Sequence, residues 1–198
     1  MSTVSLGHGI RLLSGALFDY NKPSESDVLI TDIAAALSKV CRFAGHIHQF
    51  YSVAQHAVNT SLIVPKEHAF DALMHDTAEA FTNDLPTPLK FAVPIFKELE
   101  VKIETAMSAK FGFVYPLHEA VKVADAQMLA IEKVKLKRDL SHWDVLDGVE
   151  TDHVIHLVDL SPMTPARAER IFLARFQELT TGCKCEFPPC ECKGNDNG

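Results

Sequence analysis

The chain has 198 residues, 47% hydrophobic and 23% charged, a balance typical of one sizeable globular domain. Its formal net charge of −7 argues against a broad surface for the phosphates of duplex nucleic acid, although a small site for one nucleotide needs only a few local cations or a metal. No apolar run approaches the ~20 residues that span a bilayer, and no basic segment with an apolar core marks a secretory signal. Before the C-terminal tail the chain has one cysteine, Cys41, and so no disulfide framework, which favours a reducing cytoplasm.

The N-terminal part of the chain predicts a short hairpin or loop followed by two helices. In "IRLLSGALFDY" two apolar runs flank a Ser-Gly pair, which is typical of a hairpin. The Ala- and Leu-rich "TDIAAALSKVC" predicts a helix capped by Thr31 or Asp32. A second helix is expected from Ser52 to Val64, where Pro65 ends it.

The remaining chain continues the helical pattern. We expect a third helix over about Lys66–Phe81 and a fourth that ends at Gly112. A fifth should run over about Leu117–Arg138, and a last one should begin at Thr164, followed by Pro165. The stretch in between, "SHWDVLDGVETDHVIHLVDLSP", is irregular. The pattern predicts an all-α body.

Residues 182–198 are expected to form a Cys-rich tail, separate from a domain over residues 1–181. Four cysteines lie in "CKCEFPPCEC", namely Cys183, Cys185, Cys190 and Cys192. They are enough for a tetrahedral zinc site, but their C-x-C spacing is tighter than the usual C-x2-C of such sites. A mobile tail without metal is the alternative.

Acids and histidines interrupt the apolar helical stretches in three places. His75 and Asp76 lie together in the third helix, with Glu79 about one turn further on. His56 in "SVAQHAV" and Asp125 in "KVADAQM" stand among apolar neighbours, where an unpaired polar group is costly. Imidazole and carboxylate together suit a divalent transition metal, so we predict a joint site. Taken singly, His56 fits a hydrogen-bonded core histidine and Asp125 a salt-bridge partner.

The ordered set H…HD…D resembles the signature of HD-domain metal-dependent phosphohydrolases. The blocks "RFAGH", "YSVAQHAV", "HDTAEAFTNDLPTPLK" and "VADAQMLA" are similar to those of small HD enzymes that act on deoxynucleotides, and the similarity spans about Leu12 to Leu179. Two branches are most similar, the HD 5′-deoxynucleotidases and the small phage-type dATP triphosphohydrolases. The resemblance implies an all-α HD-domain helical bundle with a short N-terminal hairpin or loop, and a homo-oligomer.

The resemblance also implies roles for individual residues. It assigns the metal ligands as His56, His75, Asp76 and Asp125. Glu79 and Asp84 match residues that handle the water and its proton, although a solvated helix carboxylate and a turn residue before Pro86 are the ordinary alternatives. Arg42, Lys90 and His46 are candidates for binding the substrate, and the ordinary alternatives are a surface ion pair for Arg42 and a solvated side chain for Lys90. The expected cofactor is Zn, Co or Mn, with Mg as an option for a second ion.

The expected function is metal-dependent hydrolysis of a deoxynucleotide. The compact size and the N-terminal segment favour a dNTP triphosphohydrolase, with dATP preferred and triphosphate released. The alternative within the superfamily is a 5′-deoxynucleotidase that removes phosphate from dNMPs. A non-catalytic HD module that binds a nucleotide is the alternative from another class, and hydrolysis of a cyclic nucleotide or alarmone is a further option.

Overall fold

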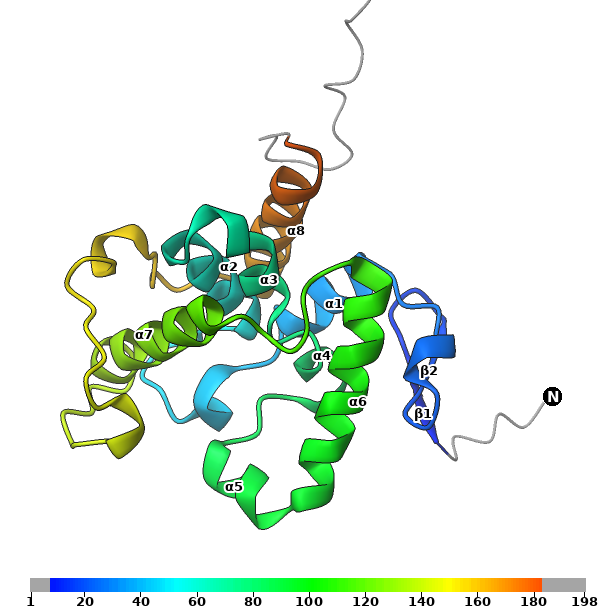
Figure 1. Ribbon diagram of the computed structural model, residues 1–198, viewed down its shortest axis with the longest axis horizontal. Coiled ribbons are helices and arrows are strands. Elements are labelled where there is room, and N and C mark those ends of the chain that lie inside the picture. The colour runs from blue at the N-terminus through cyan, green and yellow to red at the C-terminus, as the bar shows by residue number, and fades with distance from the viewer. Residues whose placement is uncertain (1–7, 183–198) are drawn as a thin grey trace, which may run out of the picture.

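The structure, a computed structural model, describes residues 8–182 (Figure 1). The predicted zinc site and boundary of the Cys-rich tail concern Cys183 and the residues beyond it, which lie outside the described residues.

The described part of the chain is mainly helical with one small hairpin, as predicted. The α-helices are α1 Ile30–Leu37, α2 Val53–Ile63, α3 Ala69–Met74, α4 Glu79–Thr82, α5 Thr87–Ala92, α6 Pro94–Phe111, α7 Glu119–Lys135 and α8 Pro165–Thr181. Short 3-10 turns are η1 Pro23–Glu25, η2 Arg42–Gly45, η3 Lys66–His68, η4 Asp144–Leu146 and η5 Ile155–Leu157. Strands β1 Gly9–Arg11 and β2 Leu17–Asp19 pair antiparallel. None of the helices within residues 8–182 has the length and apolarity to cross a bilayer.

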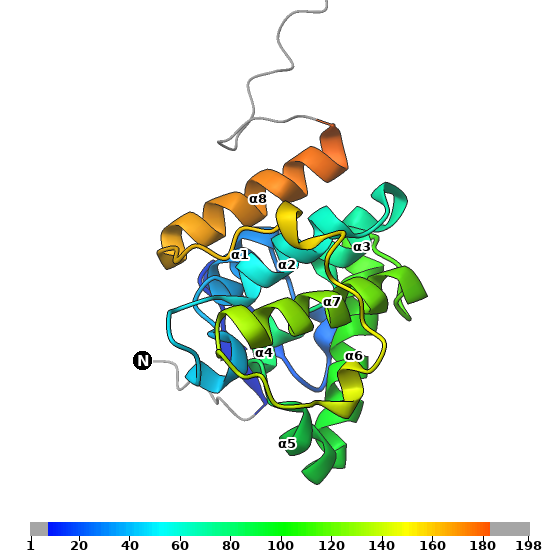
Figure 2. The ribbon, with the colours of Figure 1, turned by 90° about the vertical axis from the view of Figure 1, so that its left-hand side faces the viewer.

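The helices pack around α2, which contacts α3, α7 and α8. Figures 1 and 2 show α8 at one end of the molecule and α5 at the opposite end, and Figure 1 shows α6 beside the hairpin. Phe18 of the hairpin stacks on Phe81 with ring centroids 3.8 Å apart, so the hairpin is joined to the core rather than to the surface alone. Burial of such aromatic pairs is a large part of what holds small elements in place.

Three predicted helix ends are confirmed. Ser52 caps α2, because its hydroxyl accepts a hydrogen bond from the Gln55 backbone N–H at 3.3 Å. Thr164 caps α8 in the same way through the N–H of Arg167. α6 ends at Gly112, whose φ of 84° is the left-handed conformation that glycine adopts without strain.

The predicted cap of the first helix was wrong by two to three residues. Helix α1 begins after Leu29, and Asp32 lies inside its first turn. There its carboxylate accepts hydrogen bonds from the N–H of Leu29 at 3.1 Å and from the N–H and hydroxyl of Ser14 at 2.8 and 2.9 Å. Asp32 therefore satisfies the helix start from within and also anchors the hairpin turn.

The predicted third helix is not continuous, and its break carries the HD pair. Residues 75–78 form a turn between α3 and α4. The imidazole Nδ1 of His75 donates to the Ala72 carbonyl at 2.7 Å, and the Thr77 hydroxyl donates to the Met74 carbonyl at 2.5 Å. These carbonyls would accept the next N–H groups in a regular helix. The Met74 carbonyl also accepts the backbone N–H of Thr77 at 3.1 Å, three residues on rather than four, so the regular helix ends here.

Candidate active site

The four predicted metal ligands meet at one point and come from three separate segments. His56 comes from α2, His75 and Asp76 from the turn after α3, and Asp125 from α7. The two imidazole Nε2 atoms are 3.3 Å apart. Asp76 Oδ2 lies 3.2 Å from His75 Nε2, and Asp125 Oδ1 lies 3.1 Å from His56 Nε2. Tertiary packing therefore joins residues that are up to 69 positions apart in the sequence.

The hydrogen bonds of the two histidines fix which ring nitrogen faces the site. His56 Nδ1 lies 2.7 Å from a carboxylate oxygen of Glu132, and His75 Nδ1 lies 2.7 Å from the Ala72 carbonyl. Both partners can only accept, so each Nδ1 carries the proton when the ring is neutral. Each Nε2 then presents a lone pair toward the other, and toward the two aspartates.

This arrangement suits a divalent cation. Asp76 Oδ2 is buried and has no hydrogen-bond partner among the described residues. Donor atoms of His56, His75 and Asp125 lie within 4.8 Å of one another, and Asp76 borders this group. Lone pairs crowded together without a proton or cation repel, whereas two imidazoles and two carboxylates are a donor set for Zn, Mn, Fe or Co. The Asp125 side chain is 46% exposed, so the site is open to solvent on that side.

The same crowding shifts the pKa values of the four groups. Burial lowers the pKa of His75, but Asp76 and the hydrogen bond to Asp125 outweigh burial and hold that pKa well above its ordinary value. Burial raises the pKa of Asp76, yet the His75 imidazolium brings it down to about 2. The pKa of Asp125 is lowered well below its usual range because its hydrogen bonds to both histidines outweigh burial. In the metal-free protein, protons on the histidines thus compensate the carboxylates.

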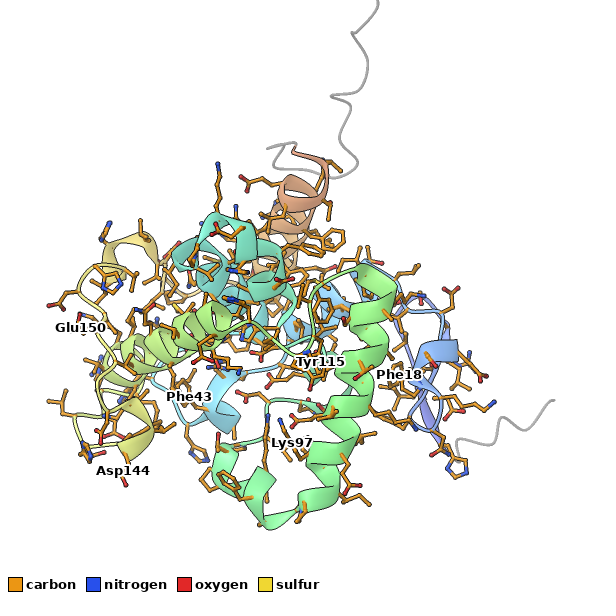
Figure 3. All side chains as sticks on the ribbon, viewed as in Figure 1. Phe18, Phe43, Lys97, Tyr115, Asp144 and Glu150 are labelled. Carbon is orange, nitrogen blue, oxygen red and sulfur yellow. The ribbon has the colours of Figure 1, made fainter. Side chains whose placement is uncertain are left out.

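Arg42 extends the site on the side of η2. Its guanidinium is buried and pairs with Glu132 at 3.0 Å, while its Nη1 lies 3.8 Å from Asp76 and 3.9 Å from Asp84. Asp84 also accepts a hydrogen bond from the backbone N–H of Phe43 at 3.2 Å. Phe43 has a φ of 56°, and Figure 3 shows it on the η2 turn that faces α7. The structure thus brings Arg42 and Asp84 next to the metal-ligand candidates.

Glu79 lies at the start of α4 and is buried. Its Oε2 has no hydrogen-bond partner within the described chain, and its Oε1 lies 3.7 Å from Lys90 Nζ. Burial raises the pKa of Glu79 well above the ordinary value, and the carboxylates of Asp76 and Asp84 raise it further. A carboxyl group with a raised pKa is suited to proton transfer.

Lys90 and His46 are less closely joined to this group. Lys90 Nζ is 2.7 Å from Glu100, so two acids already engage its charge. His46 lies on the exposed rim beyond η2, where its carbonyl accepts a hydrogen bond from Lys137. Their roles as substrate contacts stay predictions.

Two buried glutamates next to these residues were not singled out from the sequence. Glu132 lies seven residues after Asp125, two helical turns along the same face, and this spacing was the available clue. Glu104 of α6 accepts the backbone N–H of Ala78 at 3.1 Å, and nothing local in the sequence relates it to the HD pair. A separate hollow of about 420 Å³ between α7 and residues 147–153 contains none of the site residues.

Comparisons with known proteins identify the family. A family model described as "5'-deoxynucleotidase YfbR-like" matches residues 36–141, which include the four ligand candidates. The chain belongs to the YfbR-like 5′-deoxynucleotidase family. It is 44% identical over 177 residues to the uncharacterized protein YfdR of Escherichia coli, covering 89% of this chain and 98% of YfdR.

Two further relatives are more distant. An uncharacterized protein of Rhodobacter capsulatus is 30% identical over 136 residues, or 62% of this chain and 69% of that protein. The 5′-deoxynucleotidase PM0747 of Pasteurella multocida is 31% identical over 100 residues, or 48% of this chain and 42% of that protein.

Family membership confirms the predicted class of protein. The chain is an HD-type phosphohydrolase and an enzyme, with the all-α fold expected from the resemblance. HD-type hydrolases depend on a metal, in line with the converging histidines and aspartates. The comparisons favour the 5′-deoxynucleotidase alternative over the triphosphohydrolase that the sequence favoured, because the family and the Pasteurella multocida relative are both described as 5′-deoxynucleotidases.

Proposed function

We propose that the protein hydrolyses deoxynucleoside 5′-monophosphates to deoxynucleosides and orthophosphate. The observation that carries the proposal is the convergence of His56, His75, Asp76 and Asp125, in a chain that belongs to the YfbR-like family. These four residues would hold one divalent ion. Such an ion supplies Lewis acidity that polarises the phosphoryl group and acidifies water.

The proton-transfer steps fall to the buried acids. Glu79 is the candidate for taking the proton of the attacking water, because burial and the carboxylates of Asp76 and Asp84 raise its pKa and so make its carboxylate a stronger base. The water oxygen forms a bond to phosphorus as the bond from phosphorus to the 5′ oxygen breaks. The departing 5′ oxygen takes up the proton that Glu79 received from the water, and Asp84, beside Arg42, is the candidate for relaying it. Overall, water and the dNMP give a deoxynucleoside and phosphate.

Arg42 is the candidate for holding the phosphate. Its Nη1 points toward Asp76 and Asp84 at 3.8 and 3.9 Å, distances at which a phosphate oxygen could take up a stronger hydrogen bond. Lys90 is a second candidate at the edge of the site. Homo-oligomerisation is a prediction from the resemblance, and it is independent of these roles.

Product analysis tests the proposal. Metal-free protein is supplied with Co²⁺, Mn²⁺ or Zn²⁺ and incubated with each dNMP, the matching ribonucleotide monophosphates and the dNTPs. We expect orthophosphate from dNMPs, and no turnover by Asp76→Ala, which removes one ligand candidate. Triphosphate from a dNTP, with inert dNMPs, would restore the triphosphohydrolase hypothesis. Absence of any turnover with every metal would instead favour a nucleotide-binding module.

A further inference from the structure

The buried carboxylate of Glu132 connects the metal-ligand candidate His56 with the phosphate-binding candidate Arg42. Its Oε1 accepts a hydrogen bond from His56 Nδ1 at 2.7 Å. Its Oε2 accepts from Arg42 Nε at 3.2 Å and from Arg42 Nη2 at 3.0 Å. The side chain has no solvent exposure, so water cannot replace either partner. Each carboxylate oxygen of Glu132 therefore holds one residue that the proposed function uses, His56 or Arg42.

The contact with His56 decides which ring nitrogen is available to the site. A carboxylate at Nδ1 keeps the proton there and leaves Nε2 as the lone-pair donor. Asp125 Oδ1 lies 3.1 Å from that Nε2, on the opposite side of the ring. Asp125 and Glu132 are seven residues apart on α7, so one helix face contacts both nitrogens of the ring. Helix α7 thus contacts both ring nitrogens of His56, and His75 and Asp76 also face its Nε2 at 3.3 and 3.6 Å.

The contact with Arg42 decides which edge of the guanidinium is free. Glu132 occupies Nε and Nη2, and Nη1 is the nitrogen that lies near Asp76 and Asp84. Arg42 is 8% exposed and begins η2, whose next two residues have positive φ. Without the carboxylate, the guanidinium would lose the partner that holds this edge toward the site.

We propose that Glu132 is a positioning residue that sets both the metal-facing tautomer of His56 and the phosphate-facing edge of Arg42. The proposal rests on the proposed function, since it assumes that His56 binds the ion and Arg42 the phosphate. Its consequence is that metal affinity and substrate affinity depend on the same side chain. A purely structural ion pair would instead change stability and leave the metal affinity of the folded protein as it was.

Substitution Glu132→Gln separates these cases. The amide keeps the size of the side chain but has one acceptor oxygen and one NH2 group, so in either orientation one of the two partners meets a donor. We expect metal-free E132Q to bind Mn²⁺ about 10- to 100-fold more weakly by calorimetric titration. The KM for a dNMP should rise as well. E132D, which restores the charge on a shorter side chain, should recover part of the metal affinity.

Asp32→Asn is the matched control. Asp32 is another buried carboxylate, 5% exposed, that accepts three hydrogen bonds but lies at the start of α1. The Asp32→Asn substitution should lower the melting temperature and leave the Mn²⁺ affinity unchanged. Equal Mn²⁺ affinity in folded E132Q and the native protein would overturn the proposal. If the native protein bound no metal either, the proposed function itself would fail instead.

The native protein offers a test that needs no variant. Long-range ¹H–¹⁵N spectra of the full chain with and without Zn²⁺ report the tautomer of each histidine. We expect the His56 proton on Nδ1 in both states, as a low-field signal that is protected from solvent exchange. A His56 ring with its proton on Nε2 in the metal-free protein at alkaline pH would sink the proposal even if E132Q failed to fold.

Discussion

At the residue scale, the site is marked by buried carboxylate oxygens that lack a hydrogen bond. Within residues 8–182 these oxygens belong to Asp76, Glu79, Glu100 and Glu104. Unpaired buried polar atoms are costly and uncommon in folded proteins. Their gathering around the histidine pair indicates that the fold gives up stability where an ion, a phosphate or a proton is to be handled.

Glu79→Gln tests the proposed proton acceptor. The amide cannot take a proton from water, so kcat for dNMP hydrolysis should fall by about 10²- to 10⁴-fold. Metal affinity should stay within about twofold, because Glu79 is not among the ligand candidates. Kinetics and metal titration on the same protein check both results. Glu169→Gln on α8, which affects a surface ion pair with Lys39, is the control that should retain full activity. Retention of more than about a tenth of kcat in E79Q would reject the assignment.

At the element scale, the HD pair lies at the break between α3 and α4. The turn over residues 75–78 places Asp76 Oδ2 at 3.2 Å from His75 Nε2. Glu104 of α6 accepts the free Ala78 N–H, so a neighbouring helix stabilises the break.

The end of α6 provides a stability prediction. Gly112 has a φ of 84°, and a Cβ added there would meet nothing within 4 Å. Gly112→Ala should therefore cost about 1 kcal/mol in the free energy of unfolding, from backbone conformation alone. Gly112→Asn should cost less, because asparagine tolerates the left-handed region. Urea unfolding monitored by circular dichroism measures both. Equal stability of the alanine variant and the native protein would contradict this explanation of the helix end.

At the scale of the whole molecule, the acidic site couples folding to pH. Burial raises the pKa of Glu104 from 4.5 to about 8, and the nearby Asp76 carboxylate adds to this rise. Between these values the folded protein keeps a proton that the unfolded chain has released. The free energy of unfolding therefore falls as pH rises through this window.

Glu104→Gln removes this dependence. The amide is neutral at every pH, so the variant should gain stability relative to the native protein from about pH 5 to about pH 9, by at most about 5 kcal/mol. Both proteins are unfolded in urea with a chelator present, so that bound metal does not contribute to the difference. A stability difference that stays constant over this range would show that Glu104 ionises normally in the folded state.

Much of the fold could be predicted from the sequence because its causes are local. Ser52 and Thr164 cap helices through their own side chains, and Gly112 ends α6 through its backbone freedom. The H…HD…D order and its flanking blocks indicated the superfamily. The prediction was wrong where a tertiary contact overrode a local pattern. Asp32 contacts Ser14 from inside α1 rather than capping it, and Glu104 of α6 accepts the Ala78 N–H where the third helix breaks.

The helical architecture, the set of acids and histidines, and the class of enzyme were all readable from the amino-acid order. How these groups act on one another became visible only in the folded chain. Glu132 and Glu104 acquire their contacts with His56 and Ala78 across helices that are far apart in the sequence. Helix periodicity and capping act over a few residues, whereas pKa values, tautomers and unpaired lone pairs depend on distances of about 3 Å between segments that meet only after folding.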